Sequence, residues 1–137
     1  MVALITLRDM LFSSRPENIN LIEALVEELK TELKLTEETE ANMLVSLSEA
    51  VNNAIFHGNK SDPLKTVRVC VEKIEKEIVF SVEDQGVGFD LLCVRDPTAI
   101  ENLDKPTGRG IFLMRNLCDK MEYFDGGRKV VMSFLIT

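Results

Sequence analysis

Apolar and β-branched residues alternate with polar ones in several short segments of this chain, and a spacing of two predicts β-strands. In residues 65–83, two such runs on either side of a turn near Glu75 and Lys76 predict a pair of antiparallel strands. Further strands are predicted for residues 2–12, 121–124 and 130–136. The last two are joined by the turn-forming run Asp125, Gly126 and Gly127.

Elsewhere the apolar residues recur at spacings of three and four, which predicts amphipathic helices. The first helix follows Pro16 and is marked by Ile19, Ile22, Leu25, Val26 and Leu29. A second helix is predicted between Thr36, whose hydroxyl suits the N-cap position, and Gly58, a plausible stop. Residues 84–110 are rich in glycine and proline and predict a long functional loop, after which residues 111–118 resume a helical pattern.

Length, charge and cysteine content narrow the class of protein. The 137 residues suit one domain spanning residues 1–137, and a net charge of −7 argues against a nucleic-acid partner. The 3 cysteines form no CxxC pair, so we expect neither a disulfide framework nor a structural zinc site, and a reducing cytoplasm fits best. No run of about 18 apolar residues occurs, so we expect no membrane association.

Polar side chains interrupt the second predicted helix at Glu49, Asn53 and His57. Successive residues of this trio are four positions apart, so they share one face of a helix. A carboxylate can accept a proton from an attacking hydroxyl, and a carboxamide oxygen suits a hard cation such as Mg²⁺. The alternative is that Glu49 and Asn53 lie on a solvated face, with Asn53 bonded to a neighbouring loop.

A second candidate site is the run Asp84-Gln85-Gly86-Val87-Gly88, which directly follows a predicted strand. A carboxylate at a strand end can accept a hydrogen bond from the exocyclic amine of adenine, and glycines let the backbone approach a ligand closely. The same pattern also describes many hairpin turns.

A third candidate site is Thr107, Gly108, Arg109 and Gly110, immediately before the helix predicted at residues 111–118. Backbone N–H groups at a helix start form an anion site suited to phosphates, and Arg109 would add positive charge. A glycine-rich connector without a ligand is the alternative interpretation.

In their order along the chain, these three motifs resemble the N, G1 and G2 boxes of the GHKL ATPases. The run from Ser48 to Ala54, followed by His57 and Gly58, is most similar to the anti-sigma factor serine/threonine kinases. The resemblance covers roughly residues 6–134. It implies the Bergerat fold, an α+β two-layer sandwich in which helices cover one face of a mixed, mostly antiparallel sheet.

The resemblance also implies ATP and Mg²⁺ as cofactors and a role for each motif. Asn53 would coordinate Mg²⁺, Glu49 would be the general base, and Asp84 would contact adenine. His57 would lie close to the phosphates. The nucleotide loops would be shaped by Gly86, Gly88, Gly108 and Gly110.

The function that the resemblance implies is a protein kinase that binds a sigma factor or other regulator and phosphorylates a small antagonist protein, with a homodimer as one possible assembly. The chain departs from the usual pattern in two places: Arg128 and Lys129 follow Gly127, and Pro106 precedes Thr107. These departures leave open a second interpretation, a nucleotide-gated protein-binding module with little or no kinase activity.

Overall fold

The computed structural model describes residues 3–87 and 106–136, with side chains in the second range described from Gly110 onward. Its five strands form one sheet in the order β1-β2-β3-β5-β4, and all four neighbouring pairs of these described strands are antiparallel. The strands are β1 (Leu4–Ser13), β2 (Thr66–Ile74), β3 (Glu77–Glu83), β4 (Lys120–Phe124) and β5 (Lys129–Leu135).

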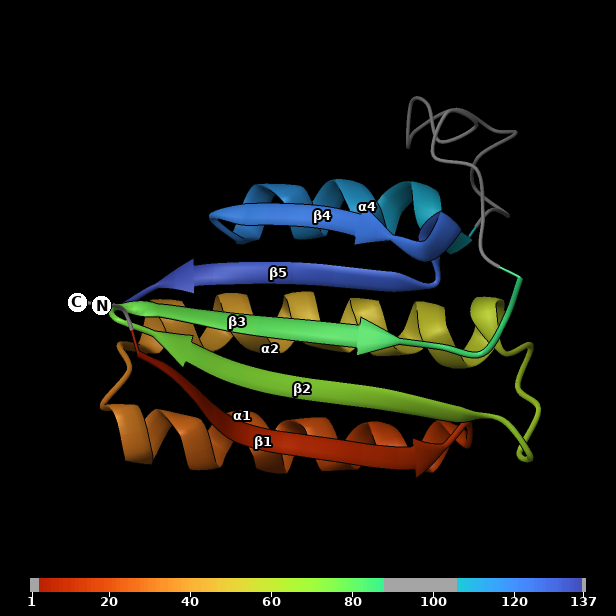
Figure 1. The fold of residues 1–137 in the computed structure, drawn as a ribbon, viewed down its shortest axis with the longest axis horizontal. Coiled ribbons are helices and arrows are strands. Elements are labelled where there is room, and N and C mark those ends of the chain that lie inside the picture. The colour runs from red at the N-terminus through yellow and green to blue at the C-terminus, as the bar shows by residue number, and fades with distance from the viewer. Residues whose placement is uncertain (1–2, 88–105, 137) are drawn as a thin grey trace.

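Helices lie against one face of this sheet, as the sequence predicts (Figure 1). A short 3₁₀ turn (Pro16–Ile19) leads into α1, and α2 is followed directly by a π-helical segment, η2. The helical elements are α1 (Asn20–Leu33), α2 (Glu37–Asn52), η2 (Asn53–Gly58) and α4 (Pro106–Leu117). The two-layer sandwich predicted from the sequence is therefore confirmed.

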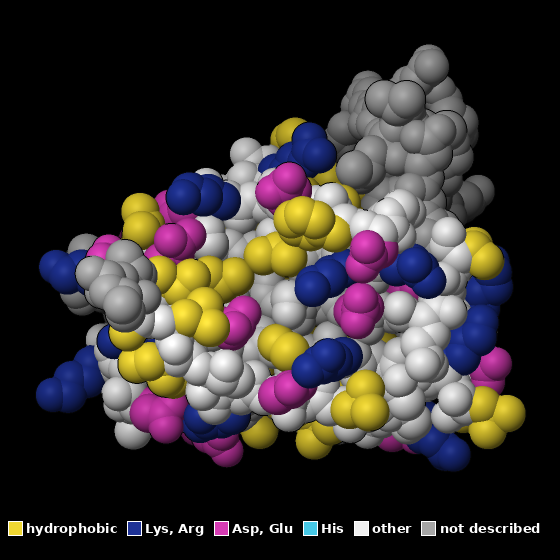
Figure 2. Space-filling view, viewed as in Figure 1, with side chains coloured by type: hydrophobic (Ala, Val, Ile, Leu, Met, Phe, Trp, Pro, Cys, Tyr) yellow, Lys and Arg dark blue, Asp and Glu magenta, His cyan; other side chains and the backbone are white. Residues whose placement is uncertain are grey.

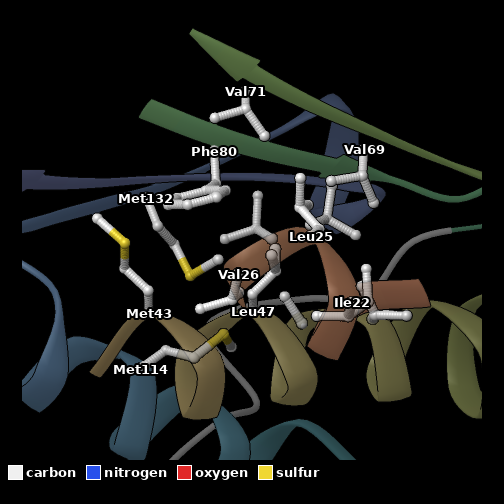
Figure 3. Close-up of a cluster of buried hydrophobic side chains, with 14 of the residues drawn as sticks. Ile22, Leu25, Val26, Met43, Leu47, Val69, Val71, Phe80, Met114 and Met132 are labelled. Atoms are coloured by element: carbon white, nitrogen blue, oxygen red, sulfur yellow. The ribbon is translucent and has the colours of Figure 1, made fainter. Parts of the chain in front are cut away.

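The core lies between the sheet and the helices and follows the predicted alternation. Ile78 and Phe80 of β3 are fully buried, whereas Val79 between them is only half-buried on the other face. The Phe80 ring meets the Phe134 ring of β5 edge-on, with centroids 5.7 Å apart. Figure 3 shows Phe80 facing α1 and α2 side chains such as Val26. This packing holds α2 against the centre of the sheet.

The second helical run begins and ends where it was predicted, but its last part has a different geometry. The Thr36 side chain accepts a hydrogen bond from the backbone N–H of Thr39 at 3.1 Å, which confirms the N-cap. From Asn53 to Gly58 the helix widens to π geometry, and the Asn59 N–H bonds to the Ala54 carbonyl five residues back. The predicted end of the helical run at Gly58 is therefore confirmed, whereas its change to π geometry was not predicted.

The start of α4 also differs from the prediction. The helix begins at Pro106, not near Ile111, so the segment 107–110 lies inside its first turns. Proline fits the first turn of a helix because its missing N–H needs no partner there and its fixed φ suits the helix. The glycines near Gly110 had masked this start in the sequence pattern.

No helix among the described residues covers the opposite face of the sheet, which carries a mixture of charged, polar and apolar side chains (Figure 2). Exposed apolar residues there include Leu4 of β1 and Leu135 of β5, near the end of the sheet where both termini lie (Figure 1). In the described segments, no helix combines the length and apolar character needed to cross a bilayer.

Candidate functional site

Glu49 and Asn53, one turn apart at the end of α2, reach the same point on α4. That point is Gly110: a Cβ built on it would lie 2.9 Å from Asn53 Nδ2 and 3.1 Å from Glu49 Oε2. The structure therefore brings together one residue of the third sequence motif and two of the first. Because Gly110 has no side chain, α4 approaches the two polar groups closely.

Asn53 carries a buried polar group without a partner. Its Nδ2 is buried and has no hydrogen-bond partner among the described residues. A buried donor left unpaired costs free energy, so such an atom points to a ligand or water that completes it. The N–H groups of the amide would donate to a phosphate oxygen or a water, and its Oδ1 would be the atom to coordinate a cation, so the side chain fits a Mg²⁺–nucleotide complex.

No cluster of three or more His, Cys, Asp or Glu side chains suited to a metal occurs in the part of the chain that the structure describes. A cation bound there would depend on Asn53 together with phosphate oxygens and water. That is how proteins commonly hold Mg²⁺ beside a nucleotide.

His57, the third member of the predicted trio, is exposed on η2. Partial desolvation of the imidazole, together with the positive charge of Lys60, lowers the pKa of His57 below its usual value. Its proposed position near phosphates stays a prediction.

The second sequence motif packs against the end of the same helical run. A Cβ on Gly86 would overlap the Gly58 carbonyl oxygen and lie 2.6 Å from the Gly58 carbonyl carbon, while a Cβ on Gly58 would overlap the Asp84 carboxyl group. Residues far apart in sequence thus meet through two glycines, and only side-chain-free positions permit it.

Asp84 is half-buried in this contact, and one of its carboxyl oxygens accepts the Gly86 backbone N–H at 2.7 Å. Burial raises the pKa of Asp84 above its usual value, although the bond from Gly86 works in the opposite direction. A partly buried acceptor at a strand end suits recognition of an amine on a flat ring.

Sequence reasoning missed Asn59, which connects the site to the sheet. It is fully buried, and its Oδ1 accepts the backbone N–H of Gln85 at 2.7 Å. The only signal in the sequence is an asparagine directly after the helix-ending Gly58, and this type of residue is common in turns at the surface.

The remaining predicted site residues are placed only in part. Thr107, Gly108 and Arg109 have helical backbone at the start of α4, where the first N–H groups lack intrahelical acceptors, and their side chains lie outside the described set. Gly88 lies outside the described residues. Their roles in nucleotide binding stay predictions.

The histidine kinase-like ATPase domain model matches residues 12–134, which span every element described above apart from most of β1 and the last residue of β5. The chain belongs to this family. The match includes all three motifs that meet at the ends of α2 and β3 and at the start of α4.

Two curated proteins similar to this ATPase domain are both named anti-sigma F factor. The anti-sigma F factor of Clostridium perfringens is 32% identical over 127 residues, covering 88% of this chain and 90% of that protein. The anti-sigma F factor of Shouchella clausii is 32% identical over 114 residues, which cover 81% of this chain and 77% of that protein.

A solved structure of the RsbU and RsbW domains of Rv1364c from Mycobacterium tuberculosis has a similar fold, with a TM-score of 0.58 at 13% identity. The similarity covers 93% of this ATPase domain but 30% of that chain. It supports the fold of the sandwich.

We expect Gly86→Ala to lower the free energy of unfolding by about 3 kcal/mol, because the new methyl group must displace backbone at Gly58. The matched control is Gly126→Ala: its φ of +68° strains alanine, but nothing lies within 4 Å, so we expect a loss of about 1 kcal/mol. Chemical denaturation measures both. Equal losses would show that the close approach at Gly86 is unimportant.

We expect Asp84→Asn to stabilise the fold at pH 7, because the raised pKa means that burial penalises the ionised carboxyl group. Lowering the pH protonates Asp84 in the folded protein before the unfolded chain, which removes this penalty. The advantage of the variant should therefore fade as the pH falls to about 4 and below. Urea denaturation across this range checks it, and an advantage independent of pH would contradict the assignment.

Proposed function

We propose that this chain is an ATP-dependent serine/threonine protein kinase of the anti-sigma factor type. It would bind a sigma factor or another regulator and transfer phosphate to a hydroxyl of a small antagonist protein. Membership of the ATPase family and the name shared by the curated relatives support this proposal.

The observation that carries the proposal is the convergence at Gly110. Glu49 and Asn53, whose buried Nδ2 has no partner among the described residues, both reach Gly110 in the first turns of α4. A carboxylate and an amide beside the N-terminal turns of a helix form a suitable place for the end of a triphosphate, since the helix dipole favours negative charge there.

Each residue then has a role consistent with its position. Asn53 would hold Mg²⁺, whose charge would offset that of the phosphates. Glu49 would accept the proton of the attacking hydroxyl. The backbone of residues 107–110 would bind phosphate oxygens, and the Asp84 carboxyl group would accept a hydrogen bond from the adenine amine.

Phosphorylation would alter the partner by charge. A phosphoryl group adds about two negative charges, which disrupt a contact surface by repulsion and desolvation. Transfer to the antagonist would therefore change which protein this kinase holds. A homodimer and a cytoplasmic location stay predictions.

The second candidate is a nucleotide-gated binding module. It is favoured by Arg128 and Lys129, which depart from the usual family pattern. The Arg128 carbonyl oxygen accepts the Asp84 N–H, so these two residues lie next to the proposed adenine contact. The two functions differ in whether a phosphorylated protein is formed. The kinase leaves labelled phosphate on an antagonist supplied with labelled ATP, whereas the module only changes its partner affinity with ATP.

We expect Glu49→Gln to bind Mg-ATP as tightly as the unaltered protein but to transfer phosphate about 10²–10⁴-fold more slowly, because the amide cannot accept the hydroxyl proton. Single-turnover transfer to a purified antagonist measures the rate, and calorimetry measures nucleotide binding. Glu23→Gln, an exposed substitution on α1, is the matched control. Unchanged transfer would eliminate the base role.

We expect Asn53→Ala to weaken ATP binding in the presence of Mg²⁺ by at least about tenfold, because it removes both polar groups of the amide. In excess chelator the two proteins should differ much less, since the metal contact is then absent. Titration calorimetry with and without Mg²⁺ checks this, with exposed Asn20→Ala as control. An equal loss in both conditions would contradict the metal assignment.

A further inference from the structure

Asn59 is a fully buried polar residue at the junction of η2 and the loop that leads to β2. It is one of four polar residues buried in the described part of the chain, and its side-chain amide has a partner on each side. A buried amide is expensive unless every group is paired, so its environment must be specific.

The nitrogen of this amide binds the ends of two strands. Asn59 Nδ2 donates to Ser14 Oγ at 2.7 Å and to the Thr66 carbonyl oxygen at 2.9 Å. Ser14 is itself fully buried, and its hydroxyl donates to the Lys65 carbonyl oxygen at 2.8 Å. The nitrogen of the Asn59 side chain is thereby fixed to the end of β1 and the start of β2.

The oxygen of the amide binds the segment that follows β3. Asn59 Oδ1 accepts the Gln85 backbone N–H at 2.7 Å, and the Gln85 side-chain oxygen in turn accepts the Thr66 backbone N–H at 2.8 Å. Gln85 is therefore held at both its backbone and its side chain. Its neighbours in the chain are Asp84 and Gly86, the residues that pack against Gly58.

We propose that Asn59 is a positioning residue for base recognition: through Gln85 it fixes the direction in which Asp84 presents its carboxyl group. This inference rests on the proposed ATP site. The Asp84 N–H donates to the Arg128 carbonyl oxygen at 2.9 Å, so the segment is held by the residue before β5 on one side and by Asn59 on the other. Neither anchor uses the Asp84 carboxyl group.

A purely structural role would have a different consequence. If Asn59 only stabilised the fold, its loss would weaken the binding of every nucleotide alike. If Asn59 orients Asp84, its loss removes mainly the contribution of the adenine amine. Inosine triphosphate carries an oxygen in place of that amine, so the ratio of the two affinities isolates this contribution.

The experiment measures dissociation constants of Mg-ATP and Mg-inosine triphosphate for the full chain and three variants by calorimetry. Asn59→Ala removes the anchor, and Ser14→Ala removes one of its partners while leaving a small side chain. Asn20→Ala, exposed on α1, is the control. Circular dichroism melting shows whether each variant is folded. If Asn59→Ala does not fold, Ser14→Ala still tests the proposal.

We expect the unaltered chain and Asn20→Ala to prefer ATP over inosine triphosphate. In Asn59→Ala, ATP affinity should fall about tenfold with little change for inosine triphosphate, and Ser14→Ala should shift the ratio in the same direction. An unchanged ratio in both folded variants would overturn the role of Asn59 but leave the ATP site intact. Absence of ATP binding by the unaltered chain would overturn the proposed function as well.

Discussion

Close packing around the backbone of three glycines is the constraint on which the candidate site depends. Gly86 abuts the carbonyl of Gly58, Gly58 abuts the carboxyl group of Asp84, and Gly110 abuts the ends of Glu49 and Asn53. Two of these contacts join the segment after β3 to the end of η2, and the third joins α4 to the polar pair of the α2–η2 helix. A methyl group at Gly86 would have to displace the Gly58 backbone, whereas one at Gly110 would have to displace the ends of the Glu49 and Asn53 side chains.

The apolar core supplies the rigidity that this arrangement needs. Val51, Ala54 and Ile55 flank Asn53 in the sequence and are buried, so the helix that carries the polar pair cannot rotate without exposing them. The site also contains two costly features: the Asn53 Nδ2 has no hydrogen-bond partner among the described residues, and the Asp84 carboxyl group is partly buried. Such features are tolerated where a ligand completes them.

Two independent lines of evidence meet at this site. The family match comes from the sequence, and the convergence at Gly110 comes from the geometry. The fold similarity at 13% identity shows that the sandwich tolerates wide sequence change, because many apolar side chains of suitable size can fill such a core. The residues at the helix end are more restricted, since close contacts and hydrogen bonds admit few alternatives.

The sequence by itself determined the local elements and the residue types of the site. Alternation marked β2 and β3, the Thr36 hydroxyl marked the start of α2, and the spacing of four put Glu49 and Asn53 on one face, because these signals depend only on neighbours in the chain. Tertiary structure decided the rest. The change to π geometry at η2 is seen only in the structure. The network around Asn59 joins residues distant in sequence, and burial of an amide leaves no periodic signal.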